Sequence, residues 1–205
     1  MLFSLSACAS EDDIQLLVQG NLDEIYLGKV SEEYMELTGS NSAACLESYE
    51  QGIQAESKFF CLLYSVENPT ESVMDDIAEM YREIYSYAKY TVSAPERLSD
   101  GSFSVKVKVY PIDIFKRVES NWDKGLEDFY SKYEYADVDA MSEEEYAAFD
   151  ADWTYSIIDN VYSNIPSLGY LKGESIAVQV QKIDGFWTVS EEDFAKIDEQ
   201  IIYYP

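Results

Sequence analysis

The sequence contains no histidine, and this absence removes several kinds of catalytic site. Histidine is the commonest general base in enzymes, a usual zinc ligand, and the partner of serine or cysteine in many hydrolases. The chain also has no Gly-rich phosphate-binding loop, no Gly-x-Ser-x-Gly nucleophile elbow and no Cys-x-x-Cys pair. Its candidate functional groups are therefore carboxylates, hydroxyls and aromatic rings.

Basic residues and long apolar runs are also scarce. The 205 residues include 14 Lys and Arg against 40 Asp and Glu, a formal net charge of -26, which repels nucleic acid and other polyanions. The sequence contains no run of 18 apolar residues, the length that could cross a bilayer. A hydrophobic content of 47% is nevertheless enough for a packed core. The composition predicts an acidic globular protein that does not bind nucleic acid, whose charge serves either solubility or a cationic ligand or partner.

The beginning of the chain resembles the lipobox of bacterial lipoproteins. A leucine stands three residues before a cysteine in Leu5–Cys8, small residues lie between them, and a polar stretch follows. The resemblance implies that the Cys8 thiol receives a diacylglycerol and that cleavage before Cys8 makes it the mature N-terminus. We therefore expect residues 1–7 to be the remnant of a signal peptide and residues 8–13 a polar tether. Cys8 would attach the protein to the extracytoplasmic side of the cell membrane.

The other two cysteines, Cys45 and Cys61, fall on one predicted helix and are sixteen residues apart. At the rise of an α-helix they are separated by about 24 Å, far more than the roughly 7 Å between Cα atoms that a disulfide spans. A break of the helix near Gly52 would let them meet. Two buried thiols and a disulfide therefore both remain open.

Apolar residues at helical spacing, together with capping residues, predict most of the helices. Ser10 caps the first helix, Ser31 opens the second and Gly39 ends it, and Ser142 begins a capping box. Asn68 and Pro69 are predicted as the N-cap and first position of the fourth. The predicted helices cover about 10–26, 32–37, 42–63, 69–87, a long section after Pro111, 142–165 and 190–201.

Two segment pairs alternate between apolar and polar residues and predict antiparallel hairpins. The first pair is Tyr90–Ala94 with Phe103–Val109, and the second is Ile176–Val180 with Phe186–Val189 across an Asp-Gly turn. Hairpins separated by helices predict an α+β fold, in which one four-stranded antiparallel sheet packs against several helices. Residues 14–205 are expected to form a single domain of this kind.

Carboxylates are the only plentiful catalytic groups. Asp150 and Asp152 flank Trp153, which could stack on a sugar, but residues two apart on a helix point to different faces. Asp137, Asp139 and the glutamates 143–145 offer oxygen ligands for calcium, yet they do not follow the EF-hand pattern. We therefore predict no catalytic residue, no metal site and no cofactor.

Aromatic residues make up 15% of the chain. Trp122, Trp153 and Trp187 stand at positions where helix or strand periodicity predicts a buried side chain. Packing is one interpretation of this pattern. The other is a cavity lined by tyrosine and tryptophan, between the sheet and the helices, that binds a small molecule or a glycan.

The lipobox, the segments Ile25–Gly28 and Tyr34–Gly39, and the closing pattern from Asp184 to Ile201 together resemble uncharacterised lipoproteins of Gram-positive bacteria. This resemblance implies a domain similar to the nuclear-transport-factor-2 (NTF2-like) or cystatin-like folds and transfers no catalytic residue. We predict a lipid-anchored, non-enzymatic module that binds a ligand or partner. The alternatives are a cell-envelope hydrolase that uses paired carboxylates and a cytosolic acidic protein that binds a partner.

Overall fold

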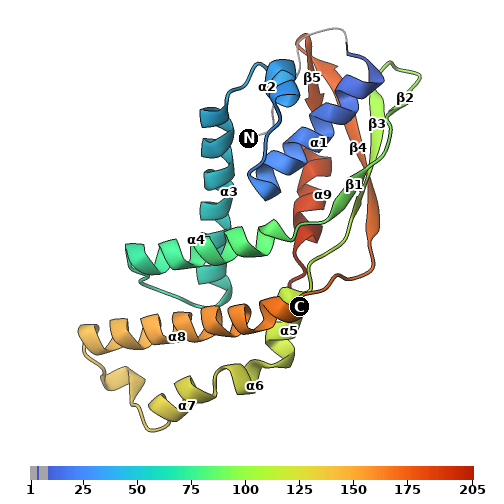
Figure 1. Ribbon diagram of the computed structural model, residues 1–205. Coiled ribbons are helices and arrows are strands. Elements are labelled where there is room, and N and C mark those ends of the chain that lie inside the picture. The colour runs from blue at the N-terminus through green and yellow to red at the C-terminus, as the bar shows by residue number, and fades with distance from the viewer. Residues whose placement is uncertain (1–3, 5–8) are drawn as a thin grey trace. The chain divides into compact units, whose positions relative to one another are not determined.

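The computed structural model describes Ser4 and residues 9–205 (Figure 1). Cys8 and the other residues of the predicted lipobox lie outside the described residues. The chain divides into two compact units. The sheet unit comprises the residues up to Gly52, Tyr85–Ile112 and Tyr170–Tyr203. The helical unit comprises Ile53–Ile84, Asp113–Gly169 and Tyr204–Pro205.

The helices at the start of the sheet unit begin and end at the predicted capping residues. Ser10 caps α1 (Glu11–Leu27) in a capping box with Asp13, and Ser31 caps α2 (Glu32–Thr38). Gly28 and Gly39 end these helices with φ of 60° and 66°, a left-handed conformation that costs glycine little. The sequence prediction of both helices is confirmed.

The two predicted hairpins form one antiparallel sheet. Its strand order is β1-β3-β4-β5, and the short β2 pairs with β3. In the second hairpin, Asp184 and Gly185 have φ of 51° and 90°, as a tight two-residue turn requires. The strands are β1 (Tyr90–Val92), β2 (Glu96–Arg97), β3 (Phe103–Val109), β4 (Glu174–Ile183) and β5 (Phe186–Val189).

One face of the sheet is covered by helices. Val105 and Val107 of β3 and Val178 and Val180 of β4 are fully buried, whereas the residues that alternate with them are partly or wholly exposed. Helices α1 and α9 (Glu191–Ile201) pack against these strands (Figure 1). The α+β class with an antiparallel sheet packed on helices is thus confirmed, while the NTF2-like or cystatin-like assignment stays a prediction.

Helices α3 (Ser42–Leu63) and α4 (Glu71–Ser86) each contribute residues to both units. The start of α4 corrects the sequence prediction by two residues. The Thr70 hydroxyl accepts a hydrogen bond from the backbone N–H of Val73 at 3.3 Å, so Thr70 rather than Asn68 acts as the cap. The backbone N–H of Asn68 donates instead to the Asp150 carboxylate.

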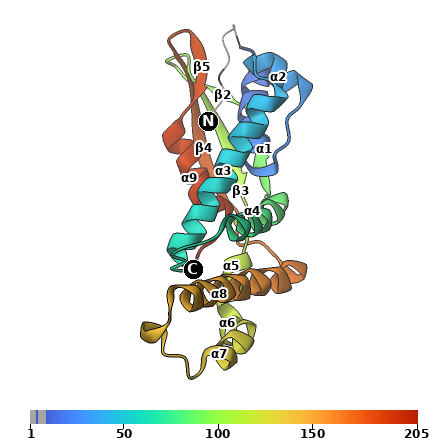
Figure 2. The same ribbon diagram turned by 90° about the vertical axis from the view of Figure 1, so that its left-hand side faces the viewer.

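The helical unit contains α8 and a series of shorter helices. The long helical section predicted after Pro111 is interrupted at Asn121 and Leu126, whose φ values of -110° and -111° depart from helical geometry. Figure 2 shows the resulting short helices α6 and α7 running beside α8. The elements are α5 (Ile114–Ser120), α6 (Trp122–Gly125), α7 (Glu127–Tyr133), a 3-10 turn (Val138–Ala140), α8 (Glu143–Asn164) and a second 3-10 turn (Ile165–Ser167).

Cys45 and Cys61 are both free thiols. They lie on α3, which continues through Gly52 without a break, so the arrangement that would bring them together does not occur. Burial raises the pKa of each thiol. The interpretation of these cysteines as two small buried residues holds for Cys45, whereas Cys61 is half-buried.

Candidate functional site

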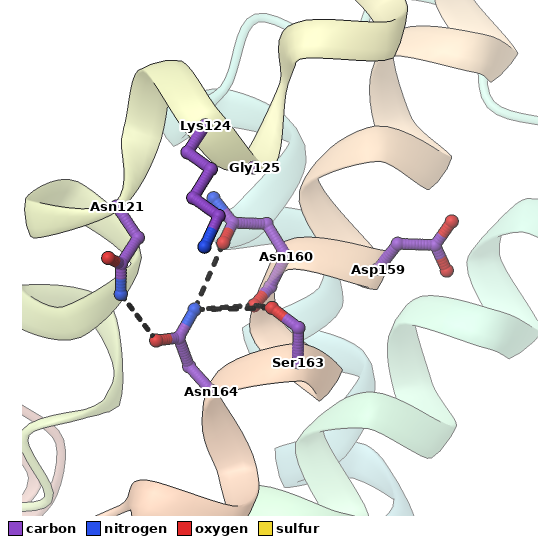
Figure 3. Close-up of a pocket in the computed structure, with 7 residues that line it drawn as sticks. All are labelled: Asn121, Lys124, Gly125, Asp159, Asn160, Ser163 and Asn164. Atoms are coloured by element: carbon purple, nitrogen blue, oxygen red, sulfur yellow. Dashed lines mark hydrogen bonds between the residues drawn. The ribbon is translucent and has the colours of Figure 1, made fainter.

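A polar cavity of about 450 Å³ lies within the helical unit, between α6 and α8. Short helix α6 supplies one wall, and the last turns of α8 supply the other. Side chains with amide, hydroxyl, ammonium and carboxylate groups line it (Figure 3): Asn121, Lys124, Asp159, Asn160, Ser163 and Asn164, together with Gly125.

The asparagines form a directed chain of hydrogen bonds. The Nδ2 of Asn121 donates to the Oδ1 of Asn164 at 2.8 Å, and the Nδ2 of Asn164 donates to the Oδ1 of Asn160 at 3.0 Å (Figure 3). Asn164 also donates to the backbone carbonyl of Asn160 at 2.8 Å. Because Asn160 and Asn164 are four residues apart on α8, they share one helix face. This chain fixes which end of each amide is the donor.

The last amide in this series of hydrogen bonds, that of Asn160, has a donor without an acceptor among the described residues. Asn160 is 2% exposed, and its Nδ2 has no hydrogen-bond partner among the described residues. A buried polar group left without a partner costs about 1–3 kcal/mol. An acceptor that reached this amide, from a ligand or from water, would remove this cost.

Gly125 allows the Asn160 amide to occupy its position. A Cβ atom at residue 125 would lie 2.3 Å from Cγ and Nδ2 of Asn160, which is far inside van der Waals contact. The main chain of α6 therefore lies directly against this amide. Glycine is required at position 125 because the Asn160 amide lies too close for a Cβ atom, and not because of the backbone φ angle.

Two opposite charges border the cavity. Lys124 on α6 and Asp159 on α8 are both exposed, and Figure 3 shows the Lys124 side chain extending toward the asparagines while Asp159 points away from them. The cavity thus offers the Lys124 ammonium and the Ser163 hydroxyl, with the Asn160 amide buried in its wall. Hydroxyl groups suit such a mixed set, because each can both donate and accept.

The helical unit also contains a hollow that is lined mainly by aromatic side chains. It encloses about 560 Å³, and the ring of Trp153 lies 5.9 Å from Trp122 and 5.2 Å from Phe129, measured between centroids. The Nε1 of Trp153 donates to the backbone carbonyl of Tyr64 at 2.8 Å, which satisfies the indole. The lining residues are Leu63, Tyr64, Ser65, Trp122, Phe129, Tyr146, Phe149, Asp150 and Trp153.

The three tryptophans have different roles. Trp187 on β5 is 8% exposed and packs edge-on against Phe103 of β3, with centroids 5.2 Å apart, so packing accounts for it. Trp122 and Trp153 are half-buried and line the aromatic hollow. Two of the three tryptophans therefore line a hollow, but it lies among the helices of the helical unit and not between the sheet and the helices, where the cavity was predicted.

The carboxylate pair considered from the sequence has separate surroundings. Asp152 accepts hydrogen bonds from Lys132 and Tyr133, and the Lys132 ammonium holds the pKa of Asp152 below its ordinary value. Asp150 is 5% exposed and lines the aromatic hollow. The hydrolase interpretation requires two carboxylates facing one substrate, and the different partners of these two do not support that role for them.

The acidic segment considered for calcium lies in and around the first 3-10 turn and the start of α8. Asp137 and Asp139 are exposed, and Glu145 closes a capping box with Ser142. In the part of the chain that the structure describes, no group of three or more Cys, Asp or Glu side chains is arranged to hold a metal ion.

A search of the described helices for a membrane span finds no segment of sufficient length and hydrophobicity.

Comparison with known proteins shows the fold. No protein family and no curated protein matches the sequence. One crystal structure is similar, that of a "putative lipoprotein" (ycdA) from Bacillus subtilis, with a TM-score of 0.62 and 16% sequence identity. The match covers 94% of this chain and 56% of that one, so this chain spans little more than half the length of its structural neighbour.

Proposed function

We propose that this protein is a lipid-anchored extracytoplasmic binding module, and that its polar cavity takes a small, uncharged, hydroxyl-rich ligand such as a sugar. The observation that carries the ligand assignment is the buried Nδ2 of Asn160, a donor that the asparagine chain holds in place and that has no partner among the described residues. An uncharged ligand is favoured over an anion because the net charge of -26 opposes the approach of anions.

The anchor is supported by the lipobox resemblance at Cys8 and by the fold, which is similar to that of a protein described as a candidate lipoprotein. Production in a Gram-positive host, with any natural upstream segment included, tests the anchor. Membrane partitioning is expected for the natural protein and for Cys61→Ala, and release into the soluble fraction for Cys8→Ala. Equal partitioning of the natural protein and Cys8→Ala would contradict the anchor.

The ligand is tested by titrating mono- and disaccharides while side-chain amide signals are followed by nuclear magnetic resonance. Binding is expected to shift the Asn160 amide signals, and Asn160→Ser to weaken binding about tenfold, the scale of one hydrogen bond to a buried donor. Lys116→Met is the control, because Lys116 is an exposed α5 residue outside the cavity lining. If no sugar shifts these signals, the ligand assignment is wrong and water satisfies the donor.

A further inference from the structure

Two aromatic hollows share one stacked ring pair in their lining. Tyr64 and Trp122 have ring centroids 5.9 Å apart at an interplanar angle of 14°, and both residues line both hollows. The smaller hollow, of about 360 Å³, also contains Glu119, and the larger contains Asp150. Each hollow therefore combines several aromatic rings with one carboxylate.

Asp150 is the more deeply buried of the two carboxylates. It is 5% exposed, whereas Glu119 is exposed. Its Oδ2 accepts one hydrogen bond from the backbone N–H of Asn68 at 3.3 Å. Among the described residues no lysine or arginine forms an ion pair with it, in contrast to Asp152, which pairs with Lys132. Asp150 therefore presents to the hollow a carboxylate that none of these side-chain cations neutralises.

A ligand cation could pair with this carboxylate. The rings around Asp150 favour a cation as well, because the face of an aromatic ring carries negative potential and attracts cations within about 6 Å of its centroid. A methylated ammonium suits this lining better than a primary ammonium. A primary ammonium needs several acceptors for its N–H groups, whereas a quaternary ammonium has none to satisfy.

We propose that the larger aromatic hollow binds a small soluble organic cation with a quaternary ammonium head, with Asp150 as its counter-charge and Trp122 and Trp153 as ring contacts. The net charge of -26 raises the local concentration of such cations at the surface. This site uses different residues from the polar cavity and does not depend on the function proposed for it.

Choline is the probe, and 3,3-dimethyl-1-butanol, its uncharged counterpart of the same shape, is the matched control ligand. Calorimetric titration of the full chain is expected to show binding of choline and at least tenfold weaker binding of the alcohol. Asp150→Asn is expected to weaken choline binding by a similar factor. Asp152→Asn, on the same helix but outside the hollow lining, is expected to leave it unchanged.

Trp122→Leu provides a second test that leaves the buried carboxylate in place, and it is also expected to weaken choline binding. Thermal unfolding of each variant shows whether it is folded. Equal binding of choline and the alcohol, or equal choline binding by Asp150→Asn and the natural protein, would overturn the proposal. So would a lack of any choline binding.

Two further measurements distinguish this site from the polar cavity and from a surface that binds lipid. Asn160→Ser alters only the polar cavity and is expected to bind choline normally, so the two sites succeed or fail separately. Vesicles of phosphatidylcholine present the same ammonium head on a lipid. Binding to these vesicles without binding of free choline would overturn the assignment of a soluble cation.

Discussion

Both units bury apolar side chains, and they differ in the groups that lie beside their hollows. In the sheet unit, alternating valines of β3 and β4 meet apolar residues such as Ile197 of α9, and these side chains are fully buried. In the helical unit, Trp122 and Trp153 are only half-buried, and Asn160 and Asp150 are buried beside cavities. Close-packed aliphatic layers leave few voids. Hollows of about 430 and 540 Å³ also lie in the sheet unit, but they are bordered by helices α1, α2, α3 and α9 rather than by the strands.

This difference is the basis on which both binding sites are proposed in the helical unit. Binding sites are concave and combine apolar surface with a few placed polar groups. Both requirements are met in the helical unit, where one buried donor and one buried carboxylate lie beside hollows of about 450 and 560 Å³. The sheet unit provides regular structure through its hydrogen-bonded strands. Three substitutions, with decreasing expected effect, test this comparison.

Phe103→Ala in the sheet unit should have the largest effect on stability. Phe103 is 1% exposed and lies edge-on against Trp187, so truncation removes buried surface and leaves a cavity. We expect a loss of about 3–5 kcal/mol in the free energy of unfolding, measured by urea denaturation. Phe186→Ala is the control, because Phe186 is 48% exposed at the end of the second hairpin. If both variants lose the same free energy of unfolding, the burial of Phe103 is not what stabilises the sheet unit.

Gly125→Ala tests the close contact in the helical unit. The added methyl group collides with the Asn160 amide, so we expect a loss of about 1–3 kcal/mol and displaced Asn160 amide signals. Gly52→Ala is the matched control within a helix, because a Cβ there meets nothing within 4 Å. That variant should gain about 0.5–1 kcal/mol from helix propensity. A gain in stability from Gly125→Ala would contradict the described geometry.

Glu24→Gln tests a buried carboxyl group in the sheet unit. Glu24 is 1% exposed, and burial raises its pKa above the ordinary value of 4.5. The folded state therefore holds this proton more tightly than the unfolded state, and the natural protein loses stability as the pH rises through the raised pKa. We expect the variant to be about 1 kcal/mol more stable than the natural protein at pH 7 and no more stable near pH 4.

The matched control for this pH dependence is Glu36→Gln, which changes an exposed carboxyl of α2. Thermal unfolding of the two variants between pH 4 and 7 separates burial from the simple loss of one charge. A constant difference between Glu24→Gln and the natural protein across this range would show that the Glu24 carboxyl titrates alike in the folded and unfolded states.

Much of the secondary structure follows from local signals. Ser10, Ser31 and Ser142 cap helices as predicted, because a side-chain oxygen satisfies the first free N–H groups in any tertiary setting. The Asp184-Gly185 turn is equally local. The breaks at Asn121 and Leu126 were not predicted, since the apolar spacing from Phe115 to Phe129 fits one continuous helix. Leu126 is fully buried at one of these breaks, and its burial depends on tertiary packing, which the local apolar spacing does not show.

The candidate sites were predicted less well. The tryptophans indicated a lined cavity, and Asp150 was considered only as half of a catalytic pair. The asparagine chain was missed, although Asn160 and Asn164 carried a signal: two poor helix formers, four residues apart, near the end of a predicted helix. Asn121 lies 43 residues away from Asn164 in the sequence, so no local pattern connects them.

The sequence by itself determined the acidic character, the capped helices, the antiparallel hairpins and the lipobox resemblance at Cys8, because each depends on composition or on residues a few positions apart. The tertiary structure decided that Asn160 has a donor without a partner in the described part of the chain and that Asp150 lines a hollow together with aromatic rings. Burial and long-range contact set the cost of an unpaired polar group, and neither is specified by residues that are neighbours in the chain.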